Sequence, residues 1–264
     1  MATLKGLIDF EGTIGGISAY TRNGERVIRQ KSSVSKKKMM RGKNYERTRE
    51  NMSEFGGGVT ASKILRQSIA SISRGFTDTN FTGRLQGKYR DMISLAPGKR
   101  GQRVFKPLAH AAALLAIPFD MKFHLDSVLR VQPVITVNAA RTAATLSIAG
   151  FNPFTDLFAS PGATHVELIY AIAVQPAFEY DAHTKKYKRT DGLDHHYMKT
   201  VSSGVIPLTD EAMDLSLPVS PLDLDSLYEE SALVSVLGIR FHQQTGFKTY
   251  PLETGKAMGF VSLR

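Results

Sequence analysis

The residues best suited to binding chemistry are the lysines and arginines near the start of the chain. Eleven basic residues fall between Arg22 and Arg49. A series of Lys and Arg side chains neutralises phosphates and releases counterions, which gives affinity without reading a base sequence. We therefore expect this stretch, with a second basic loop after Pro97-Gly98, to contact an anionic partner. The candidate binding residues are Arg22, Arg26, Arg29, Lys31, Lys36, Lys37, Lys38, Arg41, Lys43, Arg47, Arg49, Lys99, Arg100 and Arg103.

The net charge of +10 is distributed unevenly along the chain. Residues 1–110 hold 22 Lys/Arg and 8 Asp/Glu and carry +14, whereas residues 111–264 hold 12 and 16 and carry −4. Such an asymmetry indicates a basic face or arm that meets an anionic partner. One such partner is a nucleic acid, on whose bases Tyr20 and Tyr45 would stack. The other is an acidic protein surface, such as the rear half of a neighbouring copy. The alternative to both partners is that the basic residues form a solvated face and that Tyr20 and Tyr45 pack within the protein.

Metal binding finds less support in the sequence. Of the seven histidines, only His195 and His196 form a cluster, beside Asp194. Imidazole and carboxylate groups can ligate a metal, but adjacent residues usually point apart and no suitably spaced third ligand is evident. The absence of cysteine excludes disulfides and thiolate sites. We expect neither a metal nor a cofactor.

Catalytic motifs are also missing from the sequence. Gly56-Gly57-Gly58 followed by Ser62-Lys63 is only faintly similar to a phosphate-cradling loop. The Gly-Lys-Ser/Thr ending and the preceding strand of such loops are both absent, so these glycines are expected to bend a helix or to allow close packing. No nucleophile elbow, zinc-protease helix, dinucleotide fingerprint or paired-carboxylate pattern is evident. We expect a protein that is not an enzyme.

A β-hairpin followed by a linker is expected to position the first group of cations. Asn23-Gly24 separates two strand-like runs and suits a two-residue type I′ turn, because both central residues of that turn need φ > 0. Pairing outward from the turn predicts the cross-strand pairs Arg22–Glu25, Tyr20–Val27 and Ala19–Ile28. Apolar residues on both faces indicate that both are covered, by the chain's own C-terminal half or by a neighbouring subunit. Residues 32–43 have no periodicity and predict a flexible linker or arm.

Helical segments are expected after the arm. Apolar residues recur at helical spacing from Tyr45 to Ile72. We favour a break or kink at the three glycines there, because each Gly costs about 1 kcal/mol relative to Ala. A second helix is expected over residues 80–95, ended by Pro97-Gly98. Pro107 suits the first turn of a short helix that ends near Ala116.

From about residue 121 the sequence consists of short strand-like runs separated by Gly, Pro, Asn and Asp clusters. This pattern is typical of an antiparallel sandwich or barrel. The runs begin near residues 128, 143, 165, 177, 186, 198, 232, 247 and 259. The predicted fold is α+β: an N-terminal β-hairpin and helices followed by an antiparallel β-sandwich or barrel. We divide the chain into a hairpin and basic arm (1–43), a basic helical segment (44–118) and a β-sandwich-like domain (119–264).

The N-terminal part of the chain resembles a family of uncharacterised bacterial proteins. The resemblance rests on the spaced glycines of the hairpin, Tyr20, Asn23-Gly24, the Val27-Ile28-Arg29 ending and the later run RTRENMSEFG. It covers about residues 12–65. It implies a basic, glycine-bearing hairpin and helix followed by a β-rich half, and it implies no activity.

Two functions fit these predictions, and an enzyme, as a third class, would need a deep pocket with converging titratable groups in the β-rich half. One is a structural or assembly protein, a homo-oligomer whose N-terminal hairpin arm docks on a neighbouring subunit or another anionic partner by strand addition. The other is a nucleic-acid-binding protein without sequence preference that uses residues 22–106 as a basic surface. The first residues have no secretory signal, and the longest apolar run, residues 108–119, is too short to span a bilayer. We therefore expect a cytoplasmic or particle-associated protein with no membrane partner.

Overall fold

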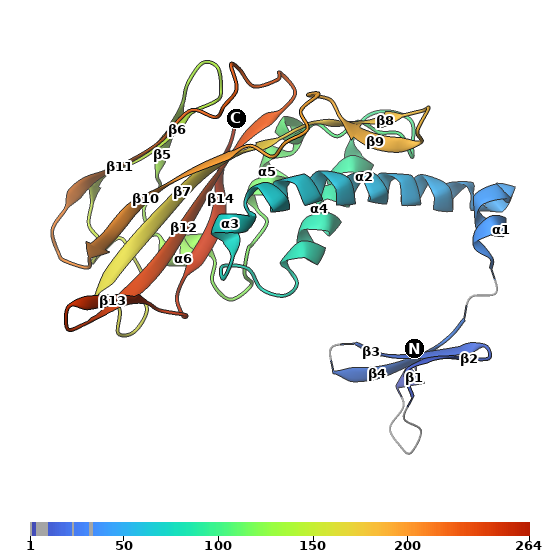
Figure 1. Cartoon of the computed structure of the whole chain (residues 1–264), viewed down its shortest axis with the longest axis horizontal. Helices are drawn as coiled ribbons and strands as arrows, with labels where there is room; N and C mark the ends of the chain where they lie inside the picture. Colours follow the sequence, from blue (N-terminus) through green and yellow to red (C-terminus); the bar gives the residue numbers. More distant parts are fainter. Residues whose placement is uncertain (1, 4–9, 23, 32–33) are drawn as a thin grey trace. The chain divides into compact units, whose positions relative to one another are not determined.

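The computed structural model of the chain describes residues 2–3, 10–22, 24–31 and 34–264. The chain divides into two compact units, residues 1–49 and residues 50–264 (Figure 1). The first contains a β-hairpin and the second combines helices with antiparallel sheets. The predicted α+β class is therefore confirmed.

Within the described residues, the first unit contains a four-stranded antiparallel sheet. Its strand order is β1 (Ala2–Thr3), β4 (Glu25–Gln30), β3 (Ile17–Arg22) and β2 (Gly12–Ile14). The register of β3 and β4 contains all three predicted cross-strand pairs, so the hairpin is confirmed. Asn23, on which the predicted turn type depends, lies outside the described residues.

Residues 36–41 form a helix where the sequence predicted a flexible linker. Ser35 caps this helix, α1 (Lys36–Arg41), and its hydroxyl accepts a hydrogen bond from the Lys38 amide at 3.2 Å. At the other end, Arg49 Nη1 donates to the carbonyl oxygens of Met39 at 2.9 Å and Gly42 at 2.7 Å. The linker prediction is therefore wrong for these residues. Their sequence has no apolar periodicity, but the Ser35 cap and the Arg49 guanidinium satisfy the backbone groups at the two ends of the helix. A 3₁₀ turn, η1 (Lys43–Tyr45), follows α1.

The second unit has three layers, with a five-stranded antiparallel sheet in the middle (Figure 1). This sheet comprises β10 (Met198–Pro207), β7 (His165–Gln175), β12 (Ala232–Thr245), β13 (Lys248–Pro251) and β14 (Ala257–Leu263). One face packs against a sheet of β11 (Met213–Val219), β6 (Ala144–Phe151) and β5 (Val134–Val137), and against α6 (Leu125–Val128). The other face packs against α2 (Glu46–Ser68), α3 (Ala70–Ser73), α4 (Phe81–Leu95) and α5 (Ala111–Leu115). A separate hairpin joins β8 (Phe178–Asp181) to β9 (Lys186–Arg189), and η2 (Pro107–His110) leads into α5.

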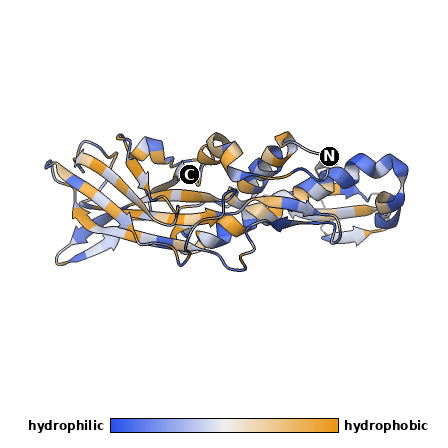
Figure 2. Ribbon diagram, turned by 90° about the horizontal axis from the view of Figure 1, so that it is seen from above, coloured by the Kyte–Doolittle hydropathy of each residue, from blue (hydrophilic) through white to orange (hydrophobic). Residues whose placement is uncertain are grey.

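The central strands β7 and β12 are buried on both faces. Ile169 and Ala171 of β7 pack in the core shared with the helices, whereas Leu168 and Tyr170 pack in the core shared with the smaller sheet. Successive side chains of a strand point to opposite faces, so a strand covered on both sides needs an unbroken apolar run. Figure 2 shows many hydrophobic residues, in orange, on the strands of the β-rich part. The packing of two antiparallel sheets face to face makes the β-rich half a sandwich rather than a barrel.

Each of the nine predicted strand-like runs contains a strand, but the sequence prediction missed β11. In β11, Leu215, Leu217 and Val219 are buried and alternate with exposed residues, as in a half-buried strand. Pro218 obscured this pattern because proline cannot donate to a ladder and is usually confined to edge strands. β11 is an edge strand of its sheet, which accommodates the proline.

Helix α2 runs without interruption through its three glycines, so the predicted break is wrong. A Cβ atom on Gly57 would lie 2.7 Å from Cγ of the Tyr187 ring. One on Gly58 would lie 3.0 Å from the backbone nitrogen of Arg90. The alternative prediction, that these glycines allow close packing, is confirmed.

The helical layer and the large sheet share one core. The ring of Phe119 lies 4.8 Å from that of Phe81 on α4 and 4.8 Å from that of Phe260 on β14, measured between centroids. The hydroxyl of Tyr89 on α4 donates to Oε1 of Gln175 at the end of β7, at 2.9 Å. The predicted helical segment and β-rich domain are thus joined by direct packing from residue 50 onward.

Arg84 fixes the start of α4 to the chain around residue 119. Its Nη1 atom donates to the two Asp78 carboxylate oxygens at 2.8 and 3.0 Å, and Nη2 donates to the carbonyl oxygens of Pro118 and Phe119. Burial raises the pKa of Asp78, but the hydrogen bonds from Arg84 and two backbone amides outweigh it and hold that pKa below its ordinary value of 3.8.

We predict that Arg84→Met lowers the free energy of unfolding by about 2 kcal/mol near neutral pH, because hydrogen bonds to charged groups are lost. Asp78 has a lowered pKa in the folded state, so its contribution is complete above 3.8 and is lost as the pH falls through the folded-state pKa. The difference in the free energy of unfolding between the wild type and Arg84→Met should therefore narrow as the pH falls through the folded-state pKa of Asp78. Urea unfolding curves at neutral and acidic pH measure it. A difference that does not change with pH would contradict the pairing.

Candidate functional site

Eleven of the fourteen candidate cations lie in the first unit, and Lys99, Arg100 and Arg103 lie in the second. Residues 1–49 hold 12 Lys/Arg and 4 Asp/Glu and carry +8, whereas residues 50–264 hold 22 and 20 and carry +2. Most of the net charge of the chain therefore belongs to its smaller unit. A surface of this charge attracts anions and accelerates their association.

The cations of the hairpin are divided between the two faces of its sheet. Residues opposite each other in an antiparallel pair point to the same side, so Tyr20, Arg22 and Arg29 share one face while Arg26 lies on the other. The Arg29 guanidinium lies 5.6 Å from the centroid of the Tyr20 ring, which is a cation–π contact. Arg26 Nη1 donates to the carbonyl oxygen of Phe10 at 3.4 Å. Lys31 follows β4 and is exposed.

The face opposite Tyr20 carries Arg26 together with a group of apolar residues, two of which are exposed. It carries Ile14, Ile17, Ala19 and Ile28, and the side chains of Ile14 and Ile17 are 64% and 48% exposed. Within the described part of the first unit, Ala19 is the only buried residue. The expected cover over both hairpin faces is therefore not provided by the described residues of this unit.

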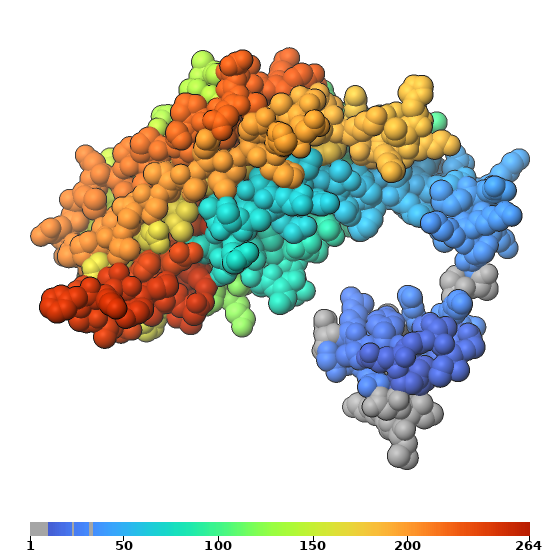
Figure 3. All heavy atoms as spheres, in the orientation of Figure 1, coloured from blue at the N-terminus to red at the C-terminus, as the bar shows by residue number. Residues whose placement is uncertain are grey.

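The cations of α1 are all exposed, and α1 buries none of its residues. Figure 3 shows the atoms of the first unit in blue. Lys36, Lys37 and Lys38 open the helix, and its first turn has no acidic residue. The positive end of the helix dipole lies there and disfavours the charges of Lys36 and Lys37, whereas Lys38 also belongs to the last turn of this six-residue helix, where a cation is favourable. The helix dipole therefore does not explain the two lysines that begin α1. Lys43 in η1 and Arg47 in α2 are also exposed, whereas Arg49 is engaged with α1.

The second basic loop has acidic partners on α2. Arg103 Nη1 lies 3.3 Å from Oε1 of the buried Glu54, which also accepts a hydrogen bond from the Gly101 amide at 2.7 Å. Arg100 Nε lies 3.7 Å from Glu50 Oε2. Lys99 is exposed in the same loop. Arg100 and Arg103 thus tie this loop to α2, which the sequence did not predict because the partners are about 50 positions apart.

The glycines of α2 do not form a phosphate cradle. Gly56, Gly57 and Gly58 lie inside a continuous helix, where backbone amides donate to carbonyl groups of the preceding turn. Across the described ranges, no group of three or more His, Asp or Glu residues is arranged to hold a metal ion. His195 and His196 are both exposed, and burial, followed by the charge of Arg189, lowers the pKa of His196.

One polar cluster on the large sheet was not predicted from the sequence. Glu167 accepts a hydrogen bond from the Ser202 hydroxyl at 2.7 Å and lies 3.2 Å from His242 Nε2 and 3.6 Å from Arg240 Nη1. A serine nucleophile needs the imidazole beside its hydroxyl to remove the proton. Here the carboxylate lies between the serine and the histidine, so these contacts join strands β7, β10 and β12 without forming a nucleophile–base pair.

Among the helices of the described residues, none is long and apolar enough to cross a membrane. Comparisons of the chain with protein-family models, with curated proteins and with solved structures found no match. The geometry described above is therefore the basis for inferring function. It offers a small cationic unit whose sheet exposes Ile14 and Ile17, and a larger, nearly neutral unit.

Proposed function

We propose that this chain is an assembly protein whose first unit docks on a neighbouring copy. The main support is that this unit carries +8 but has Ala19 as the only buried residue among its described positions. A domain of this size buries a small fraction of its surface and is only marginally stable by itself, so association would add stability. A sheet without a packed face is likewise marginal in water. A partner surface would supply the missing burial.

The mode of docking that fits the unit is strand addition. β2 stands at the end of the strand order β1-β4-β3-β2, so one of its edges has no partner strand among the described residues. Such edges pair readily with another chain. Ile14 on β2 and Ile17 on β3 would be covered at the same time. Residues 111–264 of a neighbouring copy, which carry −4, complement the charge of this unit.

Light scattering over a concentration series tests this proposal. We expect the full chain to form oligomers, and Ile14→Asp with Ile17→Asp to shift it towards monomer, because two open apolar side chains become charged. Leu95→Asp is the matched control, since Leu95 is an exposed leucine of the second unit and should leave the mass unchanged. A full chain that stays monomeric throughout, and is unaffected by deletion of residues 1–43, would refute the proposal.

A second candidate function is binding to nucleic acid, favoured by the three exposed lysines of α1, a helix with no acidic residue in its first turn. Six to ten phosphate contacts predict a fall in affinity of roughly 10³–10⁵ between about 50 and 200 mM salt. Reversing the charge of Lys36, Lys37 and Lys38 should weaken binding to labelled DNA or RNA of any sequence. Reversal of the exposed Lys185 and Lys186 is the control. This function would be excluded if the affinity for nucleic acid stayed the same at the higher salt concentration and in the variant with reversed charges at Lys36, Lys37 and Lys38.

A further inference from the structure

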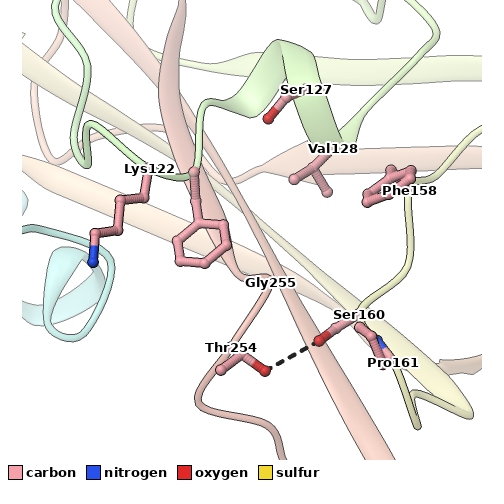
Figure 4. Close-up of a pocket in the computed structure, with 9 residues that line it drawn as sticks. Lys122, Ser127, Val128, Phe158, Ser160, Pro161, Thr254 and Gly255 are labelled. Carbon is pink, nitrogen blue, oxygen red and sulfur yellow. Dashed lines mark hydrogen bonds between the residues drawn. The ribbon is translucent and has the colours of Figure 1, made fainter.

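Three segments that are far apart in the sequence line a cavity of the second unit that is open to solvent (Figure 4). Its volume is about 660 Å³, and it lies among residues 122–128, 158–161 and 254–255. Phe123, Val128, Phe158 and Pro161 supply an apolar lining, and Lys122 is the only charged residue of the lining. Sites for small molecules in proteins have volumes of about 300–1,000 Å³ and the same mixture of apolar walls and a few polar groups.

The walls of this cavity are joined to one another by hydrogen bonds. The backbone amide of Phe158 donates to the carbonyl oxygen of Val128 at 2.8 Å. The hydroxyls of Ser160 and Thr254 are 3.1 Å apart, as the dashed line in Figure 4 shows. Gly255 has a φ of +78°, and a Cβ atom there would lie 2.5 Å from Ser160 Cβ, so only glycine brings these two walls so close. The cavity is therefore formed before any ligand enters, which lowers the entropy cost of binding.

The chemistry of the lining selects the ligand. Phe158 is 62% exposed beside the cavity, and the Arg130 guanidinium lies 5.9 Å from the centroid of its ring. None of the described residues forms an ion pair with the Lys122 ammonium. In Figure 4, Lys122 and Phe158 stand on opposite sides, with the Ser160–Thr254 pair below them. Apolar surface favours a hydrocarbon chain or ring, and an unpaired ammonium favours an anionic head group.

We propose that this cavity binds a small anionic amphiphile, with a medium-chain fatty acid as its simplest form. The hydrocarbon chain would pack against Val128, Phe158 and Pro161, and the carboxylate would pair with Lys122. Each methylene that leaves water strengthens binding roughly fourfold. The ion pair is exposed and adds up to about fivefold, so it provides selectivity more than affinity. This inference involves residues of the second unit only and does not depend on the proposed assembly.

Titration calorimetry with the full chain and fatty acids below their micelle concentrations tests the ligand class. From octanoate to decanoate to dodecanoate, we expect affinity to rise roughly 15-fold for each pair of methylenes until the cavity is full. Dodecanol should bind up to about fivefold more weakly than dodecanoate, and dodecyltrimethylammonium more weakly still. No binding by any of these probes would overturn the proposal, and so would equal affinity for the anionic and cationic amphiphiles.

Two pairs of variants test the position of the site. Phe158→Asp should lower dodecanoate affinity roughly tenfold or more. Phe154→Asp is its control, because Phe154 belongs to the same loop and is 65% exposed but does not line the cavity. Lys122→Glu should weaken dodecanoate and strengthen dodecyltrimethylammonium, whereas Lys248→Glu, at an exposed position of β13, should change neither. Equal effects of a variant and its control would overturn the assignment. All four positions are exposed, and urea unfolding curves verify that each variant is folded.

Discussion

Replacing Glu54 with alanine is expected to lower the free energy of unfolding of residues 50–264 by about 3–5 kcal/mol. The Glu54 carboxylate is buried and accepts hydrogen bonds from the Gly101 amide and from Arg103. Its removal leaves a guanidinium group largely out of water without a counter-ion, which is the main source of the cost. Urea unfolding followed by circular dichroism measures the loss.

Two further variants separate the ion pair from the packing around it. Glu54→Leu combined with Arg103→Met should recover most of the lost stability, because neither charge is then left unpaired. Tyr187→Phe should not reduce stability, since the buried Tyr187 hydroxyl has no hydrogen-bond partner. A loss below about 1 kcal/mol for Glu54→Ala would show that the pair is solvated. The large loss expected also means that substitutions at Arg103 cannot be interpreted as effects on partner binding.

Phe119→Ala is expected to have a similar effect, about 3–5 kcal/mol, because it removes a fully buried ring. This ring contacts Phe81 on α4 and Phe260 on β14, so the resulting cavity opens between the helical layer and the large sheet. Unfolding should therefore remain a single transition, with the same midpoint for helical ellipticity and for tyrosine signals of the sheet.

The matched control for Phe119→Ala is Phe154→Ala. Phe154 is an exposed phenylalanine in a loop, and surface substitutions of this kind usually change stability by less than about 0.5 kcal/mol. Two separate transitions in the Phe119 variant would contradict the shared core. They would instead favour the division into a helical segment and a β domain near residue 118 that the sequence predicted.

The parts of the fold that the sequence predicted correctly depend on local patterns. Pairing outward from the Asn23-Gly24 dipeptide in the sequence predicted the register that β3 and β4 have. The apolar runs of β7 and β12 are readable because both of their faces are buried. Helix α4 follows the predicted span, with Phe81, Leu85, Tyr89 and Met92 on its buried side.

The remaining features depend on contacts between distant residues. Arg103 looks like a free cation in the sequence and becomes a structural residue only when the loop around Gly101 reaches Glu54. The cavity lined by Phe158 needs three segments that no spacing rule connects. The amino-acid composition of the first unit predicted that its lysines and arginines are exposed and give it a positive charge. No local sequence pattern identifies the molecule that these residues contact.

The contact between Gly57 and the Tyr187 ring has a consequence for how this sequence can diverge. Any side chain at position 57 would enter space that the aromatic ring already fills, so a larger residue there becomes tolerable only if position 187 loses its ring. In an alignment of descendants of this chain, the two columns should therefore covary. Their correlation would record the docking of the β8–β9 hairpin against α2 without any structure being determined.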